Sequence, residues 1–132
     1  MKQRRKSFDV PGYSHGSTPI PTVARIDNIV MSGGISGVDI STGKYPETLD
    51  AQCANMFKLM RAVVETAGAT LDDVIKVTVF MKPPVTREAL NREWIAAFPD
   101  KDSRPVRHTV ANEHLAGSML IQCEIVAVVS DQ

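Results

Sequence analysis

The segment LDAQCANMFKLMRAVVETAGATLDDVIKVTVFMK, residues 49–82, contains the helix and the strand that decide the fold. A helix is predicted over 49–67 because apolar residues recur there at steps of three and four, and so share one helical face: Leu49, Cys53, Met56, Phe57, Met60, Val63, Val64 and Ala67. Thr48 can cap its start, and Gly68 can end it in a left-handed turn. Residues 74–82 predict a strand, because Ile75, Val77, Val79 and Met81 alternate with Lys76, Thr78 and Phe80.

The remaining elements complete an α+β pattern. Short strands are predicted over 23–26 and 29–32, with a turn at Asp27-Asn28. A second helix opens at Thr86 and places its apolar residues four apart, at Leu90, Trp94 and Phe98. Two strands follow, at about 105–111 and 119–129. The economical arrangement is one domain, 1–132, in which both helices cover one face of a mixed sheet, after an irregular N-terminal segment, 1–16.

The last strand is apolar on both sides. Glu124, Val126 and Val128 share one side, and the other side carries Ile121, Cys123, Ile125, Ala127 and Val129. A sheet with helices on one face only leaves its second apolar face uncovered. The sequence therefore predicts that the chain associates with other copies through this bare face.

Charge and composition exclude some classes of partner. The 132 residues contain 15 Lys and Arg against 15 Asp and Glu, which gives no basic excess for nucleic acid or a membrane surface. The basic start MKQRRK is not followed by an apolar run, so we expect a solvated chain end and no signal peptide. Cys53 and Cys123 form no CxxC pair and are expected to be small buried hydrophobes in a reducing cytoplasm.

Glu124 and Arg107 are the candidate chemical groups. An unpaired carboxylate in an apolar strand is costly unless it becomes neutral, and Arg107 carries a planar guanidinium that suits a carboxylate. One interpretation is a structural ion pair, or a carboxylate at a hydrated interface between subunits. In the other, Arg107 holds an anionic substrate while Glu124 handles water or a proton. The order of the strands decides between them, and the sequence does not give that order.

Motifs along most of the chain resemble the RidA (YjgF-type) family. They begin at about residue 17 and occur in the family's order: GSTP and IVMSGGIS, the segment 52–82, ALNREWIAAFP, RPVRHTV and IQCEIVAV. The most specific points of the resemblance are the Pro-x-Arg motif, Pro105 to Arg107, and Glu124 in the last strand.

This resemblance implies a chorismate-mutase-like fold and a homotrimer with clefts between subunits. It also implies hydrolysis of reactive enamines or imines, such as 2-aminoacrylate, to a 2-keto acid and ammonia without a metal or cofactor. In that family Arg107 would bind the substrate carboxylate and Glu124 would position or activate water. Ser32, Gly33 and Asn91 would line the cleft.

The chain also departs from the family pattern. Ser17-Thr18-Pro19 stands where many members have Gly-Pro-Tyr, so a cleft tyrosine is missing, and neither Tyr13 nor His15 falls at that count. Thr109 replaces a common cysteine at a substrate-binding position. These changes predict an altered pocket. A second interpretation is therefore a module that binds 2-keto acids or related anions without turnover. Nuclease or translation-inhibitor activity is disfavoured by the neutral charge and the lack of interleaved aromatic and basic residues.

Overall fold

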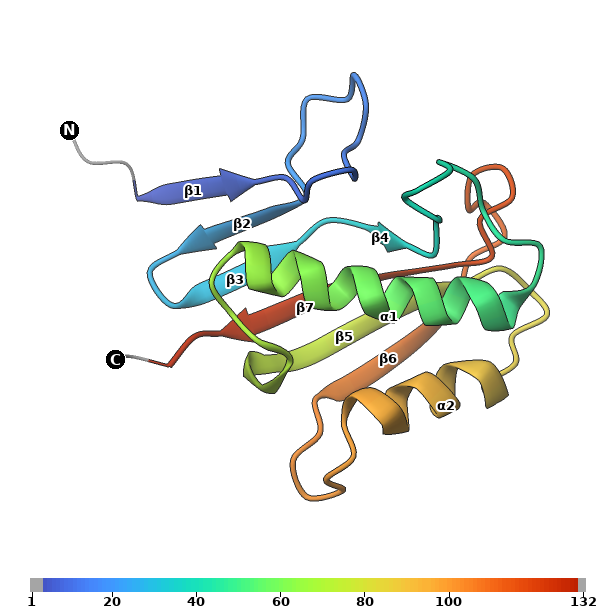
Figure 1. The fold of residues 1–132 in the computed structure, drawn as a ribbon. Helices are drawn as coiled ribbons and strands as arrows, with labels where there is room; N and C mark the ends of the chain where they lie inside the picture. The colour runs from blue at the N-terminus through green and yellow to red at the C-terminus, as the bar shows by residue number, and fades with distance from the viewer. Residues whose placement is uncertain (1–3, 131–132) are drawn as a thin grey trace.

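One mixed sheet carries both helices on the same face (Figure 1). The computed structural model describes residues 4–130. Within them the sheet order is β1-β2-β3-β7-β5-β6, with β4 also pairing with β7, and only β5 and β6 are parallel. The elements are β1 Arg5–Phe8, β2 Val23–Ile26, β3 Ile29–Ser32, β4 Ile35–Ser36, α1 Leu49–Thr66, η1 Leu71–Asp73, β5 Val74–Met81, α2 Glu88–Ala97, β6 Val106–Ala111 and β7 Ile121–Val128. The predicted α+β class is confirmed.

Helix α1 forms as its sequence predicts. The Ala51 backbone N–H donates to Thr48 Oγ1 at 3.2 Å, and Gly68 adopts a positive φ of 87° after the last turn. Its apolar face is buried against the sheet, with Cys53 and Cys123 both fully covered. Burial raises the pKa of the Cys53 thiol to about 12, which suits a packing role.

The N-terminal segment contains more regular structure than the sequence predicts. Residues 5–8 form β1, which pairs antiparallel with β2, so the irregular assignment is wrong for this stretch. Arg5–Phe8 lacks an alternating apolar pattern, and its strand conformation comes from the hydrogen bonds to β2. Met1–Gln3 lie outside the described residues, while Arg4, Arg5 and Lys6 are exposed.

The order of the C-terminal strands is the main topological finding. β5 lies between β6 and β7, because Thr78 pairs with His108 on one side and with Glu124 on the other. The strands that carry Arg107 and Glu124 are therefore not neighbours. A register irregularity between Val74 and Lys76 also buries Val74 and leaves Ile75 53% exposed, which breaks the predicted alternation at that point.

The face of the sheet opposite the helices is uncovered in this chain (Figure 1). Its exposed apolar residues include Ile29, Met31, Val106 and Val128, each between 40% and 64% exposed. The predicted bare apolar face is thus present, and association through it remains a prediction. No helix within residues 4–130 has the length and apolar character needed to span a membrane.

Candidate functional site

Arg107 lies on the helix-covered side of β6, at the edge of the sheet. It pairs with Val77, which is fully buried under the helices. Its Nη2 donates to Asn91 Oδ1 of α2 at 2.8 Å, and its guanidinium lies 4.9 Å from the centroid of the Trp94 ring. Asn91 and Trp94 are three residues apart, which brings both onto the face of α2 that meets β6. We call Arg107, Asn91 and Trp94 the guanidinium site.

The guanidinium site holds a charge that no carboxylate of residues 4–130 neutralises. Among these residues, Arg92 is the arginine that forms an ion pair, with Asp50. Burial lowers the pKa of Arg107, and the nearby positive charge of Arg87 lowers it further. An arginine nevertheless remains protonated in proteins. The site is therefore a cation held in place by a neutral amide and an aromatic face, which is the arrangement of an anion receptor.

Thr109 follows Arg107 by two residues and so faces the same side of β6. It is half-buried, and it pairs with Val79 on β5. The structure thus places three predicted site residues, Arg107, Asn91 and Thr109, on the helix side of the sheet. Trp94, which the sequence assigns to the core, is indeed buried and also supports the guanidinium.

Glu124 lies on the opposite, bare face of the sheet. It is exposed in this chain, so the sequence argument for a buried, desolvated carboxylate does not hold within one copy. It borders a shallow hollow of about 210 Å³ with Met31, Ser32, Lys76, Thr78, Ile125 and Val126. Apart from Glu124 and Ser32, none of the residues that line this hollow was predicted as a site residue. For Lys76 and Thr78, the sequence feature that points to this face is their alternation with the buried Val77.

A break in the sheet creates space beside Glu124. β3 ends at Ser32 and β4 resumes pairing with β7 at Ile35, so two glycines interrupt the ladder. The Ser32 hydroxyl accepts from the Ile125 backbone N–H at 3.0 Å and donates to the Gly33 carbonyl at 2.8 Å. The Ser32 hydroxyl thus accepts a hydrogen bond from β7 that a backbone carbonyl would accept in an unbroken strand. We call Glu124, Ser32 and Gly33 the carboxylate site.

Tyr13 helps to hold this break. Its phenol donates to the Gly34 carbonyl oxygen at 3.0 Å. A Cβ at Gly34 would meet the amide end of the Gln122 side chain, which would have to turn aside. The sequence count did not align Tyr13 with the family's tyrosine, and no local pattern marks a contact across 21 residues.

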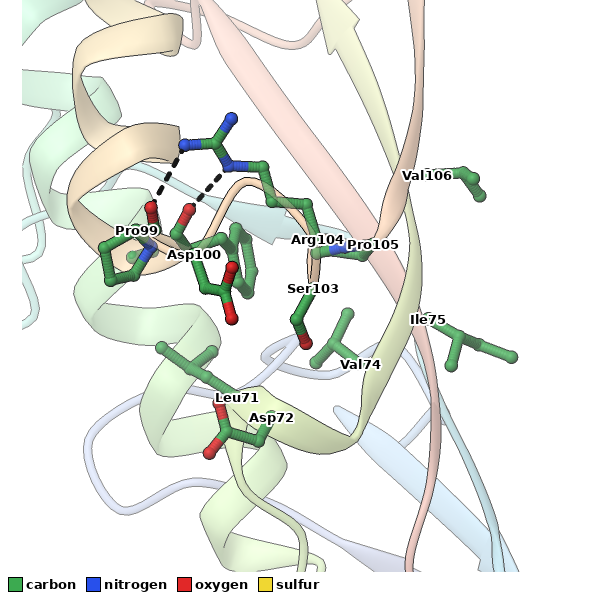
Figure 2. A pocket seen from close by; sticks show the side chains of 12 residues that line it. Leu71, Asp72, Val74, Ile75, Pro99, Asp100, Ser103, Arg104, Pro105 and Val106 are labelled. Carbon is green, nitrogen blue, oxygen red and sulfur yellow. Dashed lines mark hydrogen bonds between the residues drawn. The ribbon is translucent and has the colours of Figure 1, made fainter.

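Another cavity lies away from both sites. It measures about 650 Å³ and lies between η1, the start of β5 and the loop after α2 (Figure 2). Arg104 closes its helix end by donating from Nε to the Phe98 carbonyl at 2.7 Å and from Nη2 to the Pro99 carbonyl at 3.4 Å. None of the predicted site residues lines it.

The structure therefore places Arg107, Asn91 and Thr109 on the helix side of the sheet, apart from the carboxylate site. Within one copy the sheet lies between Arg107 and Glu124. A family model described as endoribonuclease L-PSP matches residues 15–129. The chain belongs to the RidA (YjgF-type) family.

Relatives of this RidA-family chain carry different names. A protein of Escherichia coli K12 named 2-iminobutanoate/2-iminopropanoate deaminase is 30% identical over 111 residues, which cover 82% of this chain and 87% of that protein. A protein of Aquifex aeolicus named only RutC family protein is 28% identical over 110 residues, which cover 83% of this chain and 88% of that protein.

Solved structures of the RidA family share the fold. The YjgF gene product of E. coli superposes with a TM-score of 0.83 at 26% identity, covering 93% of this chain and 98% of that one. A putative endoribonuclease of Thermotoga maritima superposes with a TM-score of 0.86 at 25% identity, covering 99% of this chain and 100% of that one. Family and fold are thus established, while the relatives' names do not agree on one reaction.

Proposed function

We propose that this RidA-family protein hydrolyses a 2-imino acid to a 2-keto acid and ammonia, at a site completed between copies of the chain. The observation that carries the proposal is Arg107, a fixed guanidinium with no carboxylate partner in the described residues. A 2-imino acid carries the carboxylate that such a receptor binds. Relatives named imine deaminases support this choice of substrate class.

The chemistry needs few groups. Arg107 holds the substrate carboxylate, and the imine carbon beside it is already electrophilic. Glu124 of a neighbouring copy takes a proton from water as the new C–O bond forms and the C=N π bond breaks. Glu124 returns that proton to the nitrogen, which gives the carbinolamine. Glu124 then takes the proton of the carbinolamine hydroxyl and passes it to the nitrogen, so that the C–N bond breaks, ammonia leaves and the carbonyl forms. Ser32 and Gly33 border the place of the water, and Thr109 borders the carboxylate.

The two surfaces that meet are different, which favours a ring. The β6 edge of one copy, with its guanidinium site, contacts the bare face of the next copy, with its carboxylate site. Contacts of this head-to-tail kind close into cyclic assemblies, and a homotrimer is the form implied by the family resemblance. Covering Met31, Val126 and Val128 would also remove apolar surface from water. The proposal includes a cytoplasmic location, because both cysteines are free.

The test uses 2-iminobutanoate, made in place by an amino acid oxidase from 2-aminobutanoate, with the keto acid followed by a coupled dehydrogenase. The wild-type protein should accelerate keto-acid formation, and Arg107→Ala should lose about 100-fold or more of that acceleration. Arg92→Ala is the matched control, because Arg92 lies on α2 but is paired with Asp50 of α1. Equal rates with Arg107→Ala and wild type would reject the proposal.

A second candidate function is anion binding without turnover. It is favoured by Ser17-Thr18-Pro19 at the place of the family's cleft tyrosine, and by Tyr13, whose hydroxyl is already engaged with Gly34. This candidate predicts a raised melting temperature with 2-oxobutanoate and no acceleration with any imine tested.

A further inference from the structure

A second guanidinium adjoins the guanidinium site. Arg87 is the N-cap residue of α2, and its carbonyl accepts from the Asn91 backbone N–H at 2.8 Å. Side chains four residues apart on a helix lie on one face, with their Cβ atoms about 5–6 Å apart. Asn91 in turn accepts from Arg107. Arg107 and Arg87 are therefore both hydrogen-bonded to Asn91, Arg107 through the amide side chain and Arg87 through its backbone carbonyl.

These two like charges have no ion-pair partner among residues 4–130, although Arg92 on the same helix pairs with Asp50 of α1. Glu88 follows Arg87 directly, and adjacent residues on a helix do not face each other. The charge of Arg87 also reaches Arg107, because it lowers the pKa of that guanidinium. Repulsion between two nearby cations raises the free energy of the site without a ligand. A ligand with two negative charges relieves this repulsion and is therefore favoured.

We propose that the substrate of this protein carries a second anionic group, as a short 2-imino dicarboxylate does. Arg107 binds the carboxylate beside the imine, and Arg87 binds the distal acid. This inference rests on the proposed function, because it names the substrate class of that same site. Arg87 is a specificity residue: it is exposed and touches the end of the substrate that does not react.

Binding of two keto acids with five-carbon chains separates this claim from the catalytic one. Calorimetry at low salt compares 2-oxoglutarate, with two carboxylates, and 2-oxopentanoate, with one. Wild type should bind 2-oxoglutarate more tightly, by about fivefold, and Arg87→Gln should remove most of that preference. Arg87→Gln should change 2-oxopentanoate affinity less than about twofold, and Arg92→Gln should preserve the preference.

Turnover is measured in parallel on the 2-imino acids made in place from glutamate and from 2-aminopentanoate. The inference is upheld if Arg87→Gln selectively raises KM for the diacid imine. Equal affinity of wild type for the two keto acids, no binding of either, or a preference that survives Arg87→Gln would each overturn it. Failure of the proposed function has a different signature, in which the binding preference is present and neither imine is hydrolysed faster.

Discussion

Arg107 and Glu124 project from opposite faces of one sheet, because they pair with consecutive residues of the strand between them. Arg107 pairs with Val77, and Glu124 pairs with Thr78. Successive side chains on a strand point to opposite faces. This register excludes an ion pair between them within one chain, and it leaves each residue facing outward from a different surface. The proposed imine hydrolase, in which both residues act on one substrate, is therefore expected to combine two copies.

Asn91→Ala should weaken substrate binding more than it affects stability. The amide fixes one nitrogen of Arg107 at 2.8 Å, and its own side chain is exposed. We expect KM for a 2-imino acid to rise about tenfold, with a smaller change in kcat, and the free energy of unfolding to change by less than about 0.5 kcal/mol. Steady-state kinetics and urea unfolding measure the two effects. A normal KM would show that Arg107 does not depend on this contact.

Tyr13→Phe tests the tie between the N-terminal segment and the sheet break. The variant keeps the ring but loses the hydroxyl that donates to Gly34, so we expect a loss of about 1 kcal/mol in the free energy of unfolding. Burial raises the pKa of Tyr13 above its usual 10.0. A raised phenol pKa means that this tyrosine stabilises the fold fully below pH 10 and that the contribution is lost as the pH rises through the folded value.

The pH profile supplies the control for that prediction. Wild type should lose stability above pH 10 more steeply than Tyr13→Phe, because the variant has no phenol at this position to ionise. Parallel profiles for the two proteins above pH 10 would contradict the role given to Tyr13.

Gly37→Ala should be strongly destabilising. A Cβ at this position would collide with the backbone of Gln52 in α1, and backbone cannot move aside as a flexible side chain does. We expect a loss of about 1–3 kcal/mol in the free energy of unfolding, by urea denaturation. Gly33→Ala is the matched control, since the nearest atoms to its Cβ would lie at an ordinary 3.9 Å. Similar losses in both variants would contradict this packing argument.

Met31→Lys tests the bare face. Met31 is 54% exposed and borders the hollow beside Glu124, so a lysine there should not harm the isolated chain. In an assembly through this face it would place an ammonium where an apolar side chain would otherwise be covered, which is costly. Sedimentation should show a shift toward monomer together with loss of imine hydrolysis. An unchanged assembly would place the subunit contact on another surface.

Local patterns predicted much of this fold. Helix α1 follows from its apolar stripe, with the cap at Thr48 and the left-handed Gly68 where the sequence places them. The alternation along β7 correctly separated Glu124 from the buried Cys123 and Ile125. Each of these features depends on residues near one another in the chain.

Features set by distant partners were not predictable. The strand β1 exists because β2 pairs with it, and the two-residue β4 exists because β7 does. The position of β5 between β6 and β7 depends on the strand order, which local patterns do not give. The register of this order places Arg107 and Glu124 on opposite faces of the sheet. The contact of Arg107 with Asn91 joins residues whose nearness depends on α2 packing beside β6.

Subunit mixing tests the shared site most directly. Arg107→Ala and Glu124→Ala are each expected to be inactive, and are then unfolded and refolded together in equal amounts. A site whose arginine and glutamate come from adjacent copies is intact when a Glu124→Ala copy supplies the arginine and an Arg107→Ala copy supplies the glutamate. Each of the two positions around a site receives the required variant with a probability of one half. About a quarter of the sites, and so about a quarter of wild-type imine hydrolysis, should therefore return. If the mixture stays as inactive as its two components, the site is not shared between copies.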